Sequence, residues 1–337
     1  ILLVGAASGT HERGALEIAL LPEDDAQVSA KRILVLLHEP ATVLPRGTPS
    51  WLGARRLDAH YHVRPDRGAD VARVARLVTG RGIGLVLSGG GAPGFGHIGA
   101  VRALREPGVP FDAIGGTSQG GLLACQFAMG WDDDTIMAKN PGAIRHKFDY
   151  TFPITALMEG ASMTEVVQEM FGDAQLEDTW IPCFCVTANL TRAAMMVHDR
   201  GPVWKYARAT TSIPGLLPPV IDGGDMLVDG GVLNHLPTDV MRARADCRVV
   251  FACDATGSAQ PGHAGDTPYE TSLSGWKVLR RRLTAFATPL RVPTIAQVMT
   301  RVAAFGARQH AQAARDLADF CLHLDVRGYG VLEFGKL

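Results

Sequence analysis

The chain has 337 residues, of which 33 are basic and 34 acidic, so its formal net charge is −1. A balance this close to zero excludes a global attraction to nucleic acid, and any membrane contact has to come from a local patch. The sequence contains no apolar run of the ~18 to 20 residues that span a bilayer and no recognisable signal peptide.

The first eighty residues have the pattern of a small α/β unit. Short apolar runs indicate buried strands, three prolines indicate a loop, and apolar residues at helical spacing predict a helix that ends at Gly80. The predicted ranges are strands at 2–7 and 32–37, the loop at 40–49 and the helix at 70–78. We expect residues 1–80 to form an N-terminal α/β preamble packed on a catalytic domain.

Two successive strand, tight turn and helix units follow. Their strands, turns and helices are predicted at 83–87, 88–96 and 97–105, and then at 111–114, 115–120 and 121–129. Such repetition predicts an α/β fold with a mainly parallel sheet. We expect the catalytic core to span residues 81–255.

The rest of the chain has fewer signals. We predict helical structure over 131–180, strands at 183–188 and 249–253, a loop at 257–275, helices near 276–287 and 294–318, and a last strand at 320–325. Residues 256–337 are therefore expected to be a C-terminal helical extension with a final strand.

Gly116-Thr117-Ser118-Gln119-Gly120 matches G-x-S-x-G and lies between a predicted strand and a predicted helix. In such a sharp turn the serine hydroxyl is presented beside the free N–H groups and the positive dipole of the helix start. The pentapeptide alone fits equally a glycine turn with a serine N-cap. The flanking strand and helix favour Ser118 as a nucleophile.

A glycine-rich segment, Gly89 to Gly94, precedes this turn and fits G-x-G-x-x-G, the dinucleotide fingerprint. It equally fits an oxyanion hole, in which consecutive backbone N–H groups point into one small space. The G-x-S-x-G turn only one strand later favours the oxyanion hole. So does the lack of an acidic residue at the end of the next strand, because Asp112 opens that strand.

A nucleophilic serine needs a base, and none of the eleven histidines has a strong local signature. His60 and His62 are expected at the surface. A different candidate is Asp229, which ends an apolar run and precedes two glycines. The similar Asp222-Gly223-Gly224 predicts a hairpin turn that places Asp229 at the end of the return strand.

In this order, the glycine loop, the G-x-S-x-G turn and the later D-G-G resemble the patatin-like phospholipases. Finer matches resemble the neuropathy target esterase branch of that family; they lie at 70–73, 77–87, 212–215, 218–220, 228–237 and 329–334. The resemblance implies a three-layer α/β/α patatin-like hydrolase with a mainly parallel central sheet and no cofactor or metal. It implies Ser118 as nucleophile, Asp229 as base, and Gly89, Gly90 and Gly91 as the oxyanion loop.

The resemblance also implies a lipid ester substrate, a phospholipid or a lysophospholipid, and upstream cyclic-nucleotide-binding-like domains outside this chain. The first residue, Ile1, fits a missing upstream segment. Two positions depart from the family: Pro93 stands where a cation is usual, and Gln119 where a small or aliphatic residue is common. Either departure is expected to reduce activity or to change substrate choice.

Location and partners follow from composition and from one segment. Six cysteines without a C-x-x-C pair predict free thiols and a reducing, cytoplasmic compartment. The basic amphipathic stretch that starts at Trp276 fits peripheral membrane contact, and it equally fits a helix packed on the core. No nucleic-acid partner is expected.

Three alternatives remain open from the sequence. An α/β-hydrolase with a Ser-Asp-His triad would require His235 or His323. A nucleotide-binding module would use the loop from Gly89 to Gly94. A catalytically weak regulatory relative would fit the departure at Pro93.

Overall fold

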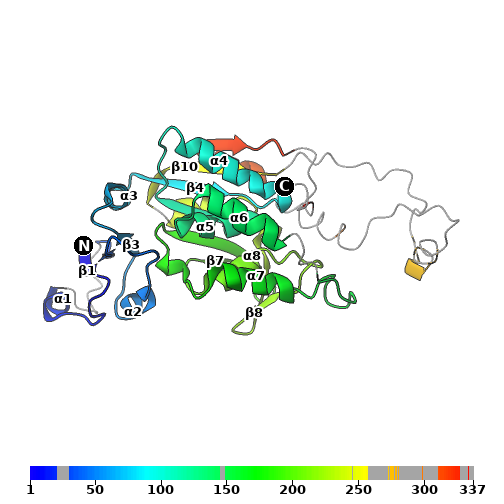
Figure 1. The fold of residues 1–337 in the computed structure, drawn as a ribbon, viewed down its shortest axis with the longest axis horizontal. Helices are drawn as coiled ribbons and strands as arrows, with labels where there is room; N and C mark the ends of the chain where they lie inside the picture. The colour runs from blue at the N-terminus through cyan, green and yellow to red at the C-terminus, as the bar shows by residue number, and fades with distance from the viewer. Residues whose placement is uncertain are drawn as a thin grey trace.

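The computed structural model describes residues 1–20, 30–144, 149–244, 246–256 and 310–326, together with residue 333 and a few positions between 272 and 298. Within this part of the chain the strands form two sheets, one of three strands and one of eight. The smaller sheet lies at one end of the molecule in Figure 1, beside the N-terminus.

The small sheet is parallel and consists of β1 (Leu2–Ala6), β2 (Ile33–Leu37) and β3 (Ala59–Val63), in that order. Alternate residues of β2 face opposite sides, as a strand requires. Ile33 and Val35 share a buried cluster with α3 (Gly68–Val78), whereas Leu34 and Leu36 pack with Trp51 of α2 (Thr48–Gly53). The short helix α1 (Ala15–Leu20) follows β1.

The large sheet has the order β11-β10-β4-β5-β6-β9-β8, and β7 pairs with β6 outside this path. Its parallel strands are β4 (Gly82–Leu87), β5 (Ala113–Thr117), β6 (Cys183–Asn189), β10 (Cys247–Asp254) and β11 (Phe320–His323). The antiparallel strands are β7 (Ala194–His198), β8 (Val220–Asp222) and β9 (Asp225–Asp229).

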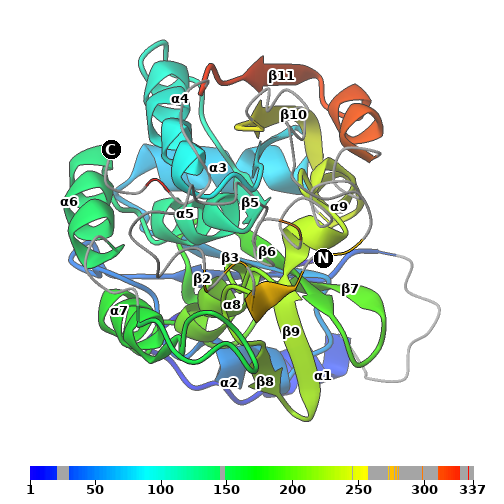
Figure 2. The same cartoon turned by 90° about the vertical axis from the view of Figure 1, so that its right-hand side faces the viewer.

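Helices cover both faces of the large sheet. On one face, Leu85 and Leu87 of β4 share a core with side chains of α4 (Gly96–Arg105), α5 (Gln119–Ala128), α7 (Ala161–Phe171) and α8 (Val203–Thr210). Ile136 of α6 (Asp133–Ile144) belongs to the same core. On the other face, Val86 packs with α9 (Thr238–Arg244) and with Ala314 of the helical residues 310–316. Figure 2 shows α4, α6 and α7 on one side of the strands and α9 on the other. The predicted three-layer α/β/α fold with a mainly parallel sheet is confirmed.

Some predicted elements differ from the structure. The predicted loop at 40–49 ends in the first turn of α2, where a proline at a helix start is tolerated. The predicted helical region 131–180 holds α6 and α7, but residues 149–160 between them form turns closed by a Tyr150–Met158 bridge. The predicted loop at 257–275 and most of the helices at 276–287 and 294–318 lie outside the described residues.

Candidate active site

Ser118 lies on the turn between β5 and α5 and has φ 56° and ψ −129°, a backbone conformation that non-glycine residues rarely adopt. The flanking glycines make this turn sterically feasible. A Cβ on Gly116 would lie 2.6 Å from the Leu87 carbonyl oxygen, and a Cβ on Gly120 would overlap the same oxygen. The G-x-S-x-G spacing therefore follows from the close packing of β4, β5 and α5.

The strand β6 brings the proposed base to the serine. β7 pairs with positions 185–189 of β6 and therefore occupies one edge of that strand. On the other edge, Cys185 and Val186 pair with β5, and positions 187–189 pair with β9. β5 and β9 therefore follow each other along the same edge of β6 and meet end to end. Thr117 pairs with Val186 and Asp229 with Thr187, so Ser118 and Asp229 meet where the two strands end.

The Ser118 hydroxyl donates a hydrogen bond of 2.6 Å to Asp229 Oδ2. The other carboxylate oxygen, Oδ1, accepts the Gly231 N–H at 2.8 Å, and the Asp229 N–H donates to the Ser212 carbonyl at 2.9 Å. A Cβ on Gly230 would overlap the Val186 carbonyl oxygen, which explains the glycine directly after the aspartate. The hairpin predicted at 222–224 is confirmed, since Asp222 pairs with Asp225.

Burial changes the acidity of this carboxyl group. Only 6% of the Asp229 surface is exposed, and burial raises its pKa to about 6, while the hydrogen bonds from Ser118 and Gly231 act in the opposite direction. A carboxylate with a pKa near 6 is a stronger proton acceptor than an ordinary aspartate and is still ionised at neutral pH.

Thr210, at the end of α8, supports the serine from behind and was not found by sequence reasoning. Its hydroxyl accepts the Ser118 N–H at 2.9 Å and donates to the Val186 carbonyl at 2.5 Å. The same hydroxyl thus links the nucleophile turn to β6, the strand that aligns β5 with β9. No local pattern distinguishes this threonine from its neighbour Thr211, so only the tertiary structure reveals it.

The glycine loop runs from β4 to the 3-10 turn η1 (Ala92–Phe95) and lies against the nucleophile turn. The Gly89 N–H donates to the His235 carbonyl at 3.0 Å. Among the described residues, no partner is recorded for the N–H groups of Gly90 and Gly91, and Gly91 has φ 61°. Of the three predicted oxyanion donors, Gly89 therefore anchors the loop, and only Gly90 and Gly91 are left as candidate donors.

The two positions that depart from the family pattern lie in and beside this loop. Pro93 is buried at the start of η1. The Gln119 side chain is buried against the loop, since a Cβ on Gly94 would lie 2.7 Å from Gln119 Cγ. Its amide nitrogen Nε2 is buried and has no hydrogen-bond partner within the described residues. A buried donor without a partner costs free energy unless a ligand satisfies it.

The histidines near the site contact the glycine loop instead of the serine. His97 Nε2 lies 2.9 Å from the Ser88 carbonyl oxygen, and burial lowers its pKa to about 4. The His235 ring packs beside Gly89, and burial lowers its pKa as well. His323 is exposed, 3.9 Å from an oxygen of Asp254. None of the described histidines hydrogen-bonds to Ser118 Oγ or to the Asp229 carboxylate, so the triad alternative finds no support here.

The expectation that His60 and His62 lie at the surface was wrong. His62 is buried and His60 is partly buried, and the Nε2 atoms of both rings contact the Glu177 carbonyl oxygen. Burial lowers the pKa of both rings. Among the described residues, no group of three or more His, Cys, Asp or Glu is arranged to hold a metal ion.

A three-layer α/β/α fold with a serine on a strained strand-to-helix turn, in contact with a buried carboxylate, has the architecture of serine hydrolases. Residues 85–242 match the family model described as patatin-like phospholipase, and residues 1–80 match that of the neuropathy target esterase family P-loop-like domain. The chain belongs to the patatin-like phospholipase family, in its neuropathy target esterase branch.

Similar proteins match over the whole chain. It is 35% identical to patatin-like phospholipase domain-containing protein 7 of Mus musculus, 30% identical to neuropathy target esterase sws of Drosophila melanogaster and 31% identical to lysophospholipase NTE1 of Mycosarcoma maydis. The matched part is 27%, 26% and 21% of those proteins, so the chain spans about a quarter of their length. No helix among the described residues is long and apolar enough to cross a membrane.

Proposed function

We propose that the chain is a serine esterase that hydrolyses acyl esters of phospholipids or lysophospholipids with a Ser118–Asp229 dyad. The observation that carries the proposal is the 2.6 Å hydrogen bond from the Ser118 hydroxyl to a buried carboxylate whose pKa is raised to about 6. The lipid class is supported by the phospholipase and lysophospholipase names of the similar proteins.

In the first half-reaction, Ser118 Oγ attacks the ester carbonyl carbon while its proton passes to Asp229 Oδ2. The N–H groups of Gly90 and Gly91 donate to the carbonyl oxygen as it becomes negative. The tetrahedral intermediate then expels the alcohol, which takes the proton from Asp229, and leaves an acyl group on Ser118.

In the second half-reaction, Asp229 accepts a proton from a water molecule as the water oxygen attacks the acyl carbon. The new intermediate expels Ser118 Oγ, which recovers the proton from Asp229, and the fatty acid leaves. One carboxyl group thus acts as base and then as acid in each half-reaction.

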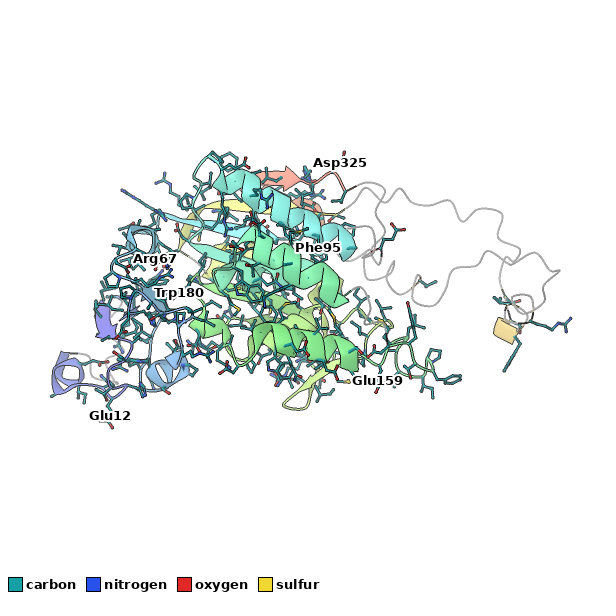
Figure 3. All side chains as sticks on the ribbon, in the orientation of Figure 1. Glu12, Arg67, Phe95, Glu159, Trp180 and Asp325 are labelled. Carbon is teal, nitrogen blue, oxygen red and sulfur yellow. The ribbon has the colours of Figure 1, made fainter. Side chains whose placement is uncertain are left out.

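The proposed membrane contact is supported by an exposed apolar turn. Phe152 and Ile154 are 80% and 82% exposed, and the turn is fixed because the Asp149 carboxylate accepts the N–H groups of Gly160 and Ser162. Glu159 ends the exposed turn, and Phe95 ends the 3-10 turn that follows the glycine loop. Figure 3 shows both residues toward the same end of the molecule, away from Arg67 and Trp180. The turn therefore suits contact with a lipid surface at the end that holds the catalytic loops.

A vesicle experiment tests that contact. The double variant Phe152→Ser/Ile154→Ser should sediment less with anionic phospholipid vesicles, while turnover of a short soluble ester stays at the wild-type rate. Val43→Ser is the matched control, because Val43 is 88% exposed and its carbonyl oxygen accepts a hydrogen bond from Trp180, which Figure 3 places toward the small sheet and away from Glu159. Equal sedimentation of all three proteins would rule the turn out as a membrane contact.

Two further proposals concern the whole protein. The six cysteines are free, which supports a reducing, cytoplasmic location. The resemblance to the neuropathy target esterase branch supports cyclic-nucleotide-binding-like domains upstream of this chain, and the similar proteins, of which the chain spans about a quarter, are long enough to contain them. No cofactor is part of the proposed reaction.

The esterase proposal is tested by fatty-acid release from a short ester and a lysophospholipid, combined with fluorophosphonate labelling. Ser118→Ala should lose both labelling and turnover, and Asp229→Asn should lower kcat by about 10³-fold or more. His235→Gln is the control and should retain turnover. A fully active Asp229→Asn variant, or an inactive His235→Gln variant that folds normally, would refute the dyad.

A further inference from the structure

A cavity lies at the opposite end of α5 from Ser118, between the small sheet and the unit built on the large sheet, which we call the catalytic unit. It has a volume of about 460 Å³, which is within the range of small-molecule sites. Its walls come from both units: residues 40–43 with Arg64, Arg67 and Arg73 on one side, and Trp180 with the C-terminal end of α5 on the other. Figure 3 shows Arg67 and Trp180 close to this junction.

The cavity lies at the carboxyl ends of parallel strands. β2 ends at Leu37 and leads to the lining residues 40–43, and β3 ends at Val63 directly before Arg64. In open parallel α/β sheets, ligands bind in the crevice outside the carboxyl ends of the strands. Arg67 is also the N-cap of α3, where the helix dipole favours an anion.

The charge of the lining is positive. Three arginines line the cavity and no acidic side chain does. Asp70 offsets part of this charge, because its carboxylate accepts hydrogen bonds from Arg64 at 2.7 Å and from Arg73 at 3.0 Å. Arg67 is exposed and has no ion-pair partner among the described residues. The cavity therefore retains an excess of cationic groups.

Two of the arginines are held in place before any ligand arrives. The Arg64 guanidinium lies 3.7 Å from the centre of the Trp180 ring. Arg73 is only 7% exposed, and its two terminal nitrogens donate to Asp70 and to the His62 carbonyl. Its third donor, Nε, is buried and without a partner in the described part of the chain. Because this atom has no accessible surface, Arg73 contributes positive charge to the cavity and no hydrogen bond to a ligand inside it.

The opposite wall does not repel an anion. It includes the end of α5, and free carbonyl groups at a helix C-terminus carry negative charge. Here those carbonyls are occupied, since Phe127 accepts from Gly130, Gln126 accepts from Trp131 and Ala128 accepts from Ile181. The negative end of α5 is therefore largely neutralised beside the cavity.

We propose that this cavity binds a small phosphate-bearing ligand, held by hydrogen bonds from Arg67 and by the positive charge of Arg64 and Arg73. The non-bridging oxygens of a phosphate group carry the negative charge that this lining complements, and the Arg67 guanidinium can donate to two of them at once. The ligand bridges the small sheet and the catalytic unit, and its site is independent of the esterase proposal. Inorganic phosphate, a nucleotide and a soluble phosphodiester headgroup share this chemistry.

The experiment titrates the whole chain by calorimetry with inorganic phosphate, AMP, ATP and glycerophosphocholine, at low ionic strength so that screening is weak. At least one probe should bind, and Arg67→Ala should weaken its binding about tenfold or more. Ala41→Phe, which fills the cavity without changing charge, should weaken it as well. Arg81→Ala is the matched control, because Arg81 is exposed just beyond the other end of α3 and forms no recorded ion pair.

The four probes distinguish the sources of the phosphate group. Binding of phosphate and both nucleotides identifies a phosphate monoester site, whereas binding of glycerophosphocholine alone identifies a headgroup site. The proposal is overturned if no probe binds at concentrations up to about 10 mM, which corresponds to ~3 kcal/mol of binding free energy. It is also overturned if Arg67→Ala and Ala41→Phe bind as tightly as Arg81→Ala.

Discussion

Ser118 and Asp229 approach each other from opposite directions along one edge of β6, and their side chains meet at 2.6 Å. The parallel strand β5 occupies the first half of that edge, and the antiparallel strand β9 occupies the second. Each partner is then fixed by its own backbone. Ser118 N–H binds Thr210, and the Asp229 N–H binds the Ser212 carbonyl. The geometry of the proposed dyad is therefore set by the strand pairing of the sheet.

The first prediction concerns the pH dependence of turnover. Because burial raises the pKa of Asp229 to about 6 and the base must be ionised, kcat/KM for an uncharged short ester should fall about tenfold per pH unit below pH ~6 and be level above it. The measurement is a pH–rate profile in wild type and His235→Gln. A profile whose midpoint moves in His235→Gln would assign the titration to the histidine instead.

The second prediction concerns the free energy of unfolding, which should be higher at low pH, whereas turnover is higher at high pH. The folded pKa of Asp229, about 6, lies above the ordinary value of an unfolded aspartate, so the folded state binds more protons between these values. The stability contributed by the protonated form is present at low pH and is lost as pH rises through about 6. A shift of about two units corresponds to ~3 kcal/mol.

Asp229→Asn removes this titration and keeps the shape of the side chain. Its unfolding free energy relative to wild type should therefore increase by ~2 to 3 kcal/mol between pH 4 and pH 8. Urea unfolding of both proteins at the two pH values gives the difference. A constant difference across this range would mean that the folded and unfolded pKa values are equal. The predicted increase would show that burying the ionised Asp229 carboxylate lowers the stability of the wild type at neutral pH.

A third prediction concerns Thr210. Thr210→Val retains the shape of the side chain but leaves the buried Ser118 N–H and the Val186 carbonyl without this partner, so unfolding free energy should fall by ~1 to 3 kcal/mol. Because the serine turn is then less fixed, kcat should fall about tenfold. Thr211→Val is the matched control, since its hydroxyl contacts only the Ala207 and Arg208 carbonyls. Equal kcat values in the two variants would contradict the positioning role.

The sequence predicted those features whose signals are local. Glycines mark the turns at 116–120 and 223–224 because close packing and positive φ leave no alternative there. The sequence did not reveal β3, because His60 and His62 alternate along it and look polar and exposed. In the structure both rings contact the Glu177 carbonyl oxygen, which is more than a hundred positions away in the chain.

The site was only partly predictable for the same reason. Ser118 and Asp229 each end a recognisable strand, but nothing in the sequence states that β5 and β9 share an edge of β6. The Gly89 N–H donates to the carbonyl oxygen of His235, which is also distant in sequence. Long-range pairing therefore decides which of three similar glycines can serve as donors.

The last prediction concerns Gln119, the residue after the nucleophile. Its buried Nε2 has no hydrogen-bond partner among the described residues, and an unsatisfied buried donor lowers the free energy of unfolding. Gln119→Met has similar length and no N–H, and it should leave stability unchanged or higher. Because Nε2 has no accessible surface and the side chain packs against Gly94, kcat and KM should stay close to the wild-type values. A kcat that falls about 10- to 100-fold with little change in KM would show instead that the amide donates to the oxyanion.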